Sequence, residues 1–109
     1  MACDEQLAER VRSLLGDRGD VAERRMFGSV VFMVAGNMAC AVMDADLLVR
    51  LGEEGAAAAL ADPHTRRAEM GTRTMKGYLR VGGEGIASDV ALRSWVDRAV
   101  AFADGLPAK

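Results

Sequence analysis

Two apolar runs separated by a glycine turn constrain the fold more than any other feature of the sequence. The runs cover residues 30–34 and 38–43, with Gly36 and Asn37 between them. A connection this short joins only antiparallel strands, and Gly36 can adopt the positive φ that a tight hairpin requires. A sheet with one solvated face alternates apolar and polar residues, and these runs do not. Either both faces of the hairpin are covered, or one face is available to a partner.

The remaining patterns predict further strands and a helix at each end of the chain. Leu7, Val11, Leu14 and Leu15 share one face of a helix expected over residues 4–15. A closing helix is expected after Ser88, with apolar residues at helical spacing along one face. We expect strands at residues 21–27, 29–34, 38–43, 47–51 and 78–81, a short helix at 53–61, and a polar segment at 63–76 that contains a loop and leaves room for a short edge strand.

This order of elements predicts an α+β fold in a single domain over residues 1–109. The expected architecture is an antiparallel sheet of about five strands, rich in meander connections, with the N-terminal and C-terminal helices packed on one face. The length of 109 residues leaves no room for a second core.

Composition and charge indicate the cellular compartment in which the protein is expected. Its 14 Lys and Arg nearly balance 16 Asp and Glu, and no apolar run approaches the ~20 residues that span a bilayer. The acidic N-terminus is unlike a signal peptide, so we expect a cytoplasmic protein without membrane contact. Cys3 and Cys40 form no disulfide framework, and both are expected to be reduced thiols.

The sequence does not supply the residue sets that enzymes or metal sites require. His64 is the single histidine and lies in a polar loop, where we favour a solvated residue over a catalytic base or metal ligand. One histidine and two separated cysteines also do not supply four zinc ligands. Met38 and Cys40 would suit Cu(I), but both residue types are common core fillers, and we favour the core interpretation. We therefore expect no catalytic residues, no metal and no cofactor, and an enzyme or ligand carrier with a pocket near Cys40 and Tyr78 is the least supported hypothesis.

One stretch of the chain is basic, although the protein as a whole is slightly acidic. Residues 64–80 hold five cations and one acid, Glu69. The cations could contact phosphates of a nucleic acid or an acidic partner. We favour the simpler alternative, a solvated hairpin whose arginines pair with nearby carboxylates. The candidate contacts are Arg66, Arg67, Arg73, Lys76 and Arg80.

Several segments together resemble the TfoX/Sxy N-terminal domain family. They are residues 25–28, 32–40, 46–50, 63–64 and 75–78 and the Trp95-Val96 pair. The resemblance implies a compact α+β domain with an antiparallel sheet and supplies no catalytic residues. It also implies a small stand-alone relative of competence regulators, which act as coactivators beside a transcription factor.

The resemblance and the apolar strands lead to one main hypothesis and one alternative. The main hypothesis is a non-enzymatic, regulatory protein-interaction domain, and the alternative is a nucleic-acid-binding accessory protein that uses residues 64–80. A homodimer is also expected, because the second sheet face needs cover. For Met26, Phe27 and Gly28 we favour a packing role, with Phe27 in the core and Gly28 in a close turn or bulge, and the same hairpin edge can also be a docking surface. The candidate interaction surface is Met26, Phe27, Gly28, Phe32 and Met33.

Overall fold

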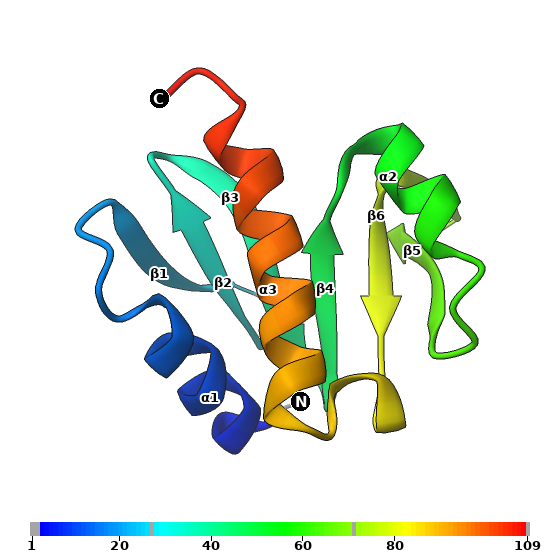
Figure 1. Ribbon diagram of the computed structural model, residues 1–109, viewed down its shortest axis with the longest axis horizontal. Helices are drawn as coiled ribbons and strands as arrows, with labels where there is room; N and C mark the ends of the chain where they lie inside the picture. Colours follow the sequence, from blue (N-terminus) through cyan, green and yellow to red (C-terminus); the bar gives the residue numbers. More distant parts are fainter. Residues whose placement is uncertain (1–2, 27, 71, 109) are drawn as a thin grey trace.

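A computed structural model describes residues 3–26, 28–70 and 72–108, with three α-helices and six strands (Figure 1). Phe27, which belongs to the candidate interaction surface, lies outside the described residues. In chain order the elements are α1 (Glu5–Leu15), β1 (Val21–Met26), β2 (Ser29–Val34), β3 (Asn37–Met43), β4 (Asp46–Arg50), α2 (Gly52–Ala59), β5 (Thr65–Met70), β6 (Arg73–Val81), the 3-10 helix η1 (Gly83–Ile86) and α3 (Asp89–Asp104).

The six strands form one antiparallel sheet in the order β1-β2-β3-β4-β6-β5. The predicted hairpin is confirmed: Val34 pairs with Asn37, and Ala35 and Gly36 form the turn with φ of 50° and 85°. Positive φ at both turn positions matches the right-handed twist of the flanking strands. The first four strands therefore form the predicted meander.

The predicted fold class is confirmed, and one segment is more regular than expected. The polar stretch after α2 forms the edge strand β5 and the first part of β6, which gives six strands instead of about five. The β5–β6 pairing shifts its register between Arg67 and Ala68. Such an irregularity bends a strand and breaks its alternation, which explains why the sequence pattern was weak there.

All three helices bury their apolar residues on the same side of the sheet (Figure 1). The main core beneath them takes alternate strand residues such as Val30, Phe32 and Val34 of β2, and Leu47 and Val49 of β4. The residues between these point to the other face, where they form a second and smaller cluster. The non-alternating apolar runs therefore supply two clusters, one on each face of the sheet.

The long helices start where side chains cap their first turns. Asp4 accepts hydrogen bonds from the backbone N–H groups of Gln6 and Leu7, and the Ser88 hydroxyl accepts one from Ala91. These caps satisfy donors that have no partner within the helix. None of the helices in the described part of the chain is long and apolar enough to cross a membrane.

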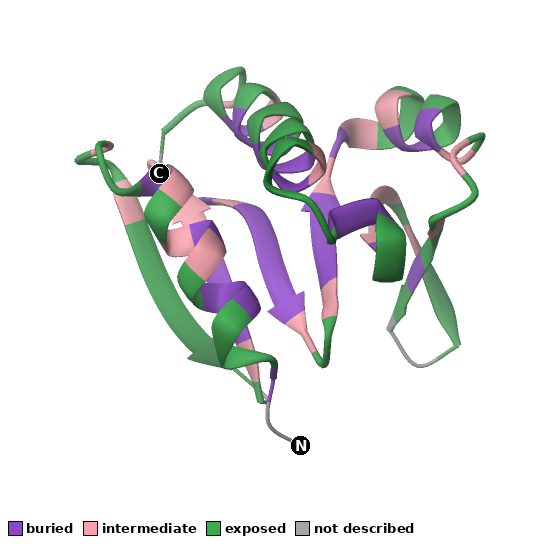
Figure 2. Cartoon of the chain, turned by 60° about the horizontal axis from the view of Figure 1, so that its bottom comes forward, coloured by how far each residue is buried: buried purple, intermediate pink, exposed green. Residues whose placement is uncertain are grey.

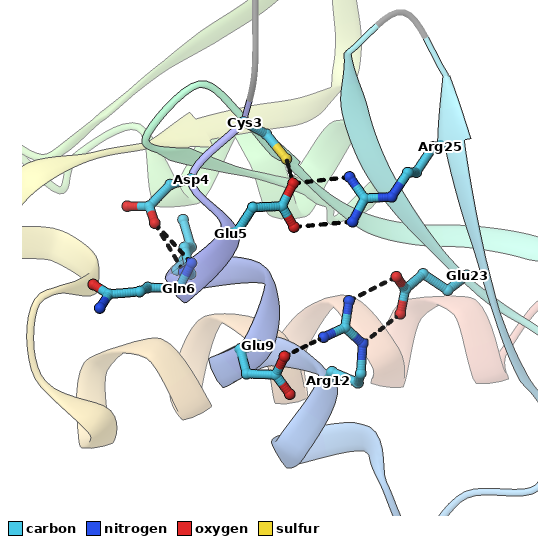
Figure 3. Close-up of polar contacts among 9 residues, drawn as sticks. Cys3, Asp4, Glu5, Gln6, Glu9, Arg12, Glu23 and Arg25 are labelled. Atoms are coloured by element: carbon cyan, nitrogen blue, oxygen red, sulfur yellow. Dashed lines mark hydrogen bonds and ion pairs between the residues drawn. The ribbon is translucent and has the colours of Figure 1, made fainter.

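Two paired ion contacts connect α1 to the edge strand β1 (Figure 3). Arg25 donates two hydrogen bonds of 2.9 Å to Glu5, and Arg12 donates two of 2.7 Å to Glu23. Hydrogen bonding to these arginines lowers the pKa of both carboxyl groups. Glu23 and Arg25 therefore turn toward α1, and strand alternation directs Arg24 to the opposite face of the sheet.

Truncation of Trp95 should destabilise the domain through loss of core packing. The side chain is 4% exposed on α3, and the Arg98 guanidinium lies 4.2 Å from its ring centre. We expect Trp95→Ala to lower the free energy of unfolding by roughly 3 to 5 kcal/mol, measured by urea denaturation followed by circular dichroism. Val90→Ala on the same helix, at a site 82% exposed, is the control and should change stability by less than about 0.5 kcal/mol. Equal stability of the two variants would contradict this core assignment.

Burial should make Cys40 unreactive in the folded protein. Loss of solvation raises the pKa of its thiol to about 12, so the folded chain keeps a proton that the unfolded chain releases at lower pH. Stability linked to this group is thus complete at neutral pH and declines above about pH 9, as the unfolded thiol ionises. In a Cys3→Ser variant, we expect Ellman's reagent to modify Cys40 at pH 8 only after denaturant is added. Rapid modification of the native variant would show that the strand opens.

Candidate functional site

The sheet face without helices carries a hollow of about 490 Å³ that we call the methionine groove. Figure 2 shows the buried strand residues that run through the centre of the sheet beneath the helices. The groove residues come from all six strands, so the hollow extends across the open face of the sheet. They are Met26, Ser29, Val31, Met38, Ala41, Met43, Leu48, Ala68, Glu69, Met75 and Arg80.

Small or branched residues form the floor of this groove, and methionines form much of its wall. Val31, Ala41, Leu48 and Ala68 are buried, between 1% and 5% exposed. Four of the seven methionines of the chain line the groove, and Met26 is 44% exposed at the β1 edge. Unbranched thioether side chains adapt to differently shaped apolar partners. The groove is therefore built for apolar contact.

The polar groups at the groove are few, and its arginine is already occupied. Arg80 donates a hydrogen bond of 2.7 Å to Asp46 and another of 2.9 Å to Asp44. Burial disfavours the charge of Arg80, but the bonds to the two carboxylates outweigh it and raise its pKa. Ser29 and Glu69 are the other polar lining residues. This arrangement favours apolar recognition over acid–base chemistry.

The structure brings together only part of the predicted interaction surface. Met26 lines the groove, Met33 packs against the same cluster, and Gly28 is exposed in the β1–β2 turn with φ of 81°. Phe32 does not belong to this surface, because strand alternation directs it under the helices, where it is 1% exposed. The role of Phe27, in packing or in binding, stays a prediction, because Phe27 lies outside the described residues.

The basic segment forms the β5–β6 hairpin, and its cations are not equally available. Arg66 and Arg80 lie opposite each other on the two strands and both contact Asp46. Arg67 donates a hydrogen bond to the Lys76 carbonyl. Arg73 and Lys76 are exposed without an ion-pair partner among the described residues. Asp44 and Asp46 thus offset part of the predicted positive charge.

The residues considered for metal or cofactor chemistry do not converge. Cys40 is fully buried in the main core, whereas Met38 packs in the cluster on the other face. Residues two apart on a regular strand share a face, but the β2–β3 pairing shifts its register at Ala39. Met38 and Cys40 therefore point to opposite faces of the sheet. Tyr78 lies beside Arg50, whose guanidinium is 5.7 Å from its ring centre. Among the described residues, no group of three or more His, Cys, Asp or Glu side chains could hold a metal ion.

Sequence reasoning missed the residues that complete the groove. Ala41 and Met43 sit in the non-alternating run, so the same signal that indicated two apolar faces could have identified them. Ala68 and Met75 lie in the polar segment at 63–76, which was expected to contain a loop with room for a short edge strand. Their contribution depends on the β5–β6 hairpin, whose bend the sequence did not indicate.

Comparison with known proteins identifies one family. The sequence model described as the TfoX N-terminal domain matches residues 13–103 of the 109 residues. Neither the search of curated proteins nor the search of solved structures found a match. The matched region includes all six strands, the last turn of α1 and all but the final residue of α3.

Asp46 should stabilise the hairpin through its two arginines. Its carboxylate side chain is 20% exposed and contacts Arg80 at 2.7 Å and Arg66 at 3.2 Å. We expect Asp46→Asn to lower the free energy of unfolding by roughly 1 to 2 kcal/mol, measured by urea denaturation at low salt. Asp44→Asn is the matched control and should cost less, because Asp44 is 59% exposed. The opposite ranking would show that Asp46 does not organise this cluster.

Proposed function

The chain belongs to the TfoX N-terminal domain family, and on that premise we propose that it is a non-enzymatic protein-binding domain that acts in the cytoplasm in the regulation of gene expression. The observation that carries the proposal is the methionine groove. The helices cover one face of the sheet, and the opposite face keeps an apolar hollow with a volume of about 490 Å³. Exposed apolar patches of this kind mark interaction sites in soluble domains.

The lining of the groove supports protein binding over catalysis. Its walls are thioether and aliphatic side chains, and the guanidinium of Arg80 is engaged by two carboxylates. A catalytic site needs an acid, base or nucleophile directed at the bound group. Apolar burial provides the binding free energy for a partner surface without such groups. We infer the regulatory role from the family, because the chain resembles competence regulators that act as coactivators of transcription.

Nucleic-acid binding through the β5–β6 hairpin is the weaker proposal. Arg73 and Lys76 support it because they are exposed on that hairpin. Arg66 and Arg80 count against it, since Asp46 already pairs with both. Such binding would weaken steeply with salt, and its salt dependence would decrease in an Arg66→Ala, Arg67→Ala variant.

Capture from native lysate tests the proposed function when the groove is compared with a remote apolar site. Immobilised protein should retain a partner protein in the presence of nuclease, identified by mass spectrometry. Met26→Asp should reduce that recovery by about tenfold, because it places a charge in the apolar contact. Val90→Asp on α3 replaces the other large hydrophobic that is exposed among the described residues, and it should leave recovery unchanged.

Three results would count against this proposal. A partner retained equally by Met26→Asp would place binding elsewhere on the molecule. Loss of every partner upon nuclease treatment would favour the β5–β6 hairpin and nucleic acid. Failure to retain any protein would remove the interaction role itself.

A further inference from the structure

The floor of the methionine groove limits which backbone conformation can occupy it. The floor residues belong to β2, β3 and β4, whose backbones pair with a strand on each side, and to the edge strand β5, which pairs with β6. The face therefore presents side chains, and most of those that line the groove are apolar. An extended segment lying there would bury N–H and C=O groups without hydrogen-bond partners. A helix avoids this cost because its backbone groups pair internally.

The shape of the groove also suits a helix. Its lining residues come from all six strands, from Met26 at one edge of the sheet to Ala68 and Glu69 at the other. A concave surface needs a convex occupant, because two concave faces would enclose a void and lose contacts. An α-helix with side chains is about 10–12 Å across and presents such a convex surface. A second copy of the open face does not fit this requirement.

The helices of this chain cannot fill the groove of a second copy. Their apolar residues are already buried against the main core. In the described part of the chain, Met26 and Val90 are the exposed large hydrophobic residues, and Val90 is the one that lies on a helix. No described helix therefore presents an apolar stripe to solvent. The occupant must be a helix from another protein.

A positive and a negative side chain lie at opposite edges of the groove, so the two edges differ in charge. Arg24 is exposed on β1 beside Val31, because its neighbours Glu23 and Arg25 turn toward α1. Glu69 lines the groove from β5. Neither Arg24 nor Glu69 has an ion-pair partner among the described residues. An incoming helix would complement them with an acidic flank toward β1 and a basic flank toward β5.

We propose that the methionine groove binds one amphipathic α-helix of a different protein, with the apolar stripe of that helix on the groove methionines and an acidic residue beside Arg24. This inference rests on the proposed function and names the kind of partner for the same surface. Met26, Met38, Met43 and Met75 adapt to the apolar side chains, as flexible thioethers do in other helix-binding grooves. Arg24 selects which flank of the helix faces β1.

A displayed library of random peptides tests the inference with the full chain as bait. Peptides of about 18 residues suffice, because a helix of that length extends about 27 Å and nearly crosses the molecule. Enriched sequences should carry apolar residues at spacings of three and four, with acidic residues along one flank. Synthetic versions should gain helical circular dichroism on binding and bind Met26→Asp about tenfold more weakly.

Charge reversal tests the role of Arg24 separately. Arg24→Glu should shift the selected flank from acidic to basic residues and weaken the original peptides by about tenfold. Arg93→Glu makes the same charge change on α3, outside the groove, and should leave both selection and affinity unchanged. Methyl NMR of the unaltered chain, labelled at Met, Leu and Val, gives the location without relying on a variant. Groove methionine signals should shift, and the methyl signals of Leu92 and Val96 in the main core should not.

Each contrary outcome has a definite meaning. Enrichment of sequences with alternating apolar residues would indicate an extended ligand and overturn the helix. Absence of enrichment, or equal enrichment on Met26→Asp, would also overturn it. If lysate capture still yields a partner that depends on Met26, the proposed function stands without the helix. If that capture fails as well, both proposals fall.

Discussion

The alternation of side chains along a strand is the constraint on which the rest of this structure depends. β2 and β3 are apolar at nearly every position, so each residue that enters the main core has an apolar neighbour on the opposite face. The helices cover one face. The second cluster and the groove above it are therefore consequences of the same strands that build the core. Polar residues at Val31, Ala41 and Leu48 would instead give the alternating pattern of a sheet with one solvated face.

Polar contacts at the two sides of the sheet have different roles. On the helix side, the pairs Glu5–Arg25 and Arg12–Glu23 connect α1 to a strand that is otherwise mostly exposed. At the other side, Asp44 and Asp46 hold Arg80 at the rim of the groove. Exposed pairs contribute little to stability individually. Their effect here is directional, because they fix where the guanidinium groups lie: those of Arg12 and Arg25 on the helix side, and that of Arg80 beside Asp44 and Asp46.

The parts of the fold that follow from local periodicity could be predicted, and the parts that need distant residues could not. The helical spacing around Val11 and Trp95 and the glycine at position 36 indicated α1, α3 and the central hairpin. The β5–β6 hairpin was obscured by its charges and by its bend at Ala68. For the site, Met26 and Met33 were identified in advance, whereas Phe32 was placed on the wrong face. Phe32 and Met33 are consecutive in β2, so strand alternation places them on opposite faces, and the packing of the helices decides which of the two is buried.

The sheet order has a consequence for how occupancy and folding are coupled. β4 pairs with β6 and not with β5, the strand that follows it in the chain. The groove is therefore complete only when β6, the last strand of the sequence, has paired with β4. No single hairpin contains the binding surface, and a partly folded chain cannot present it. A molecule bound there is thus in linkage with the complete native state and shifts the unfolding equilibrium of the whole domain by mass action. A partner that bound the proposed site would therefore select fully folded chains over partly folded ones.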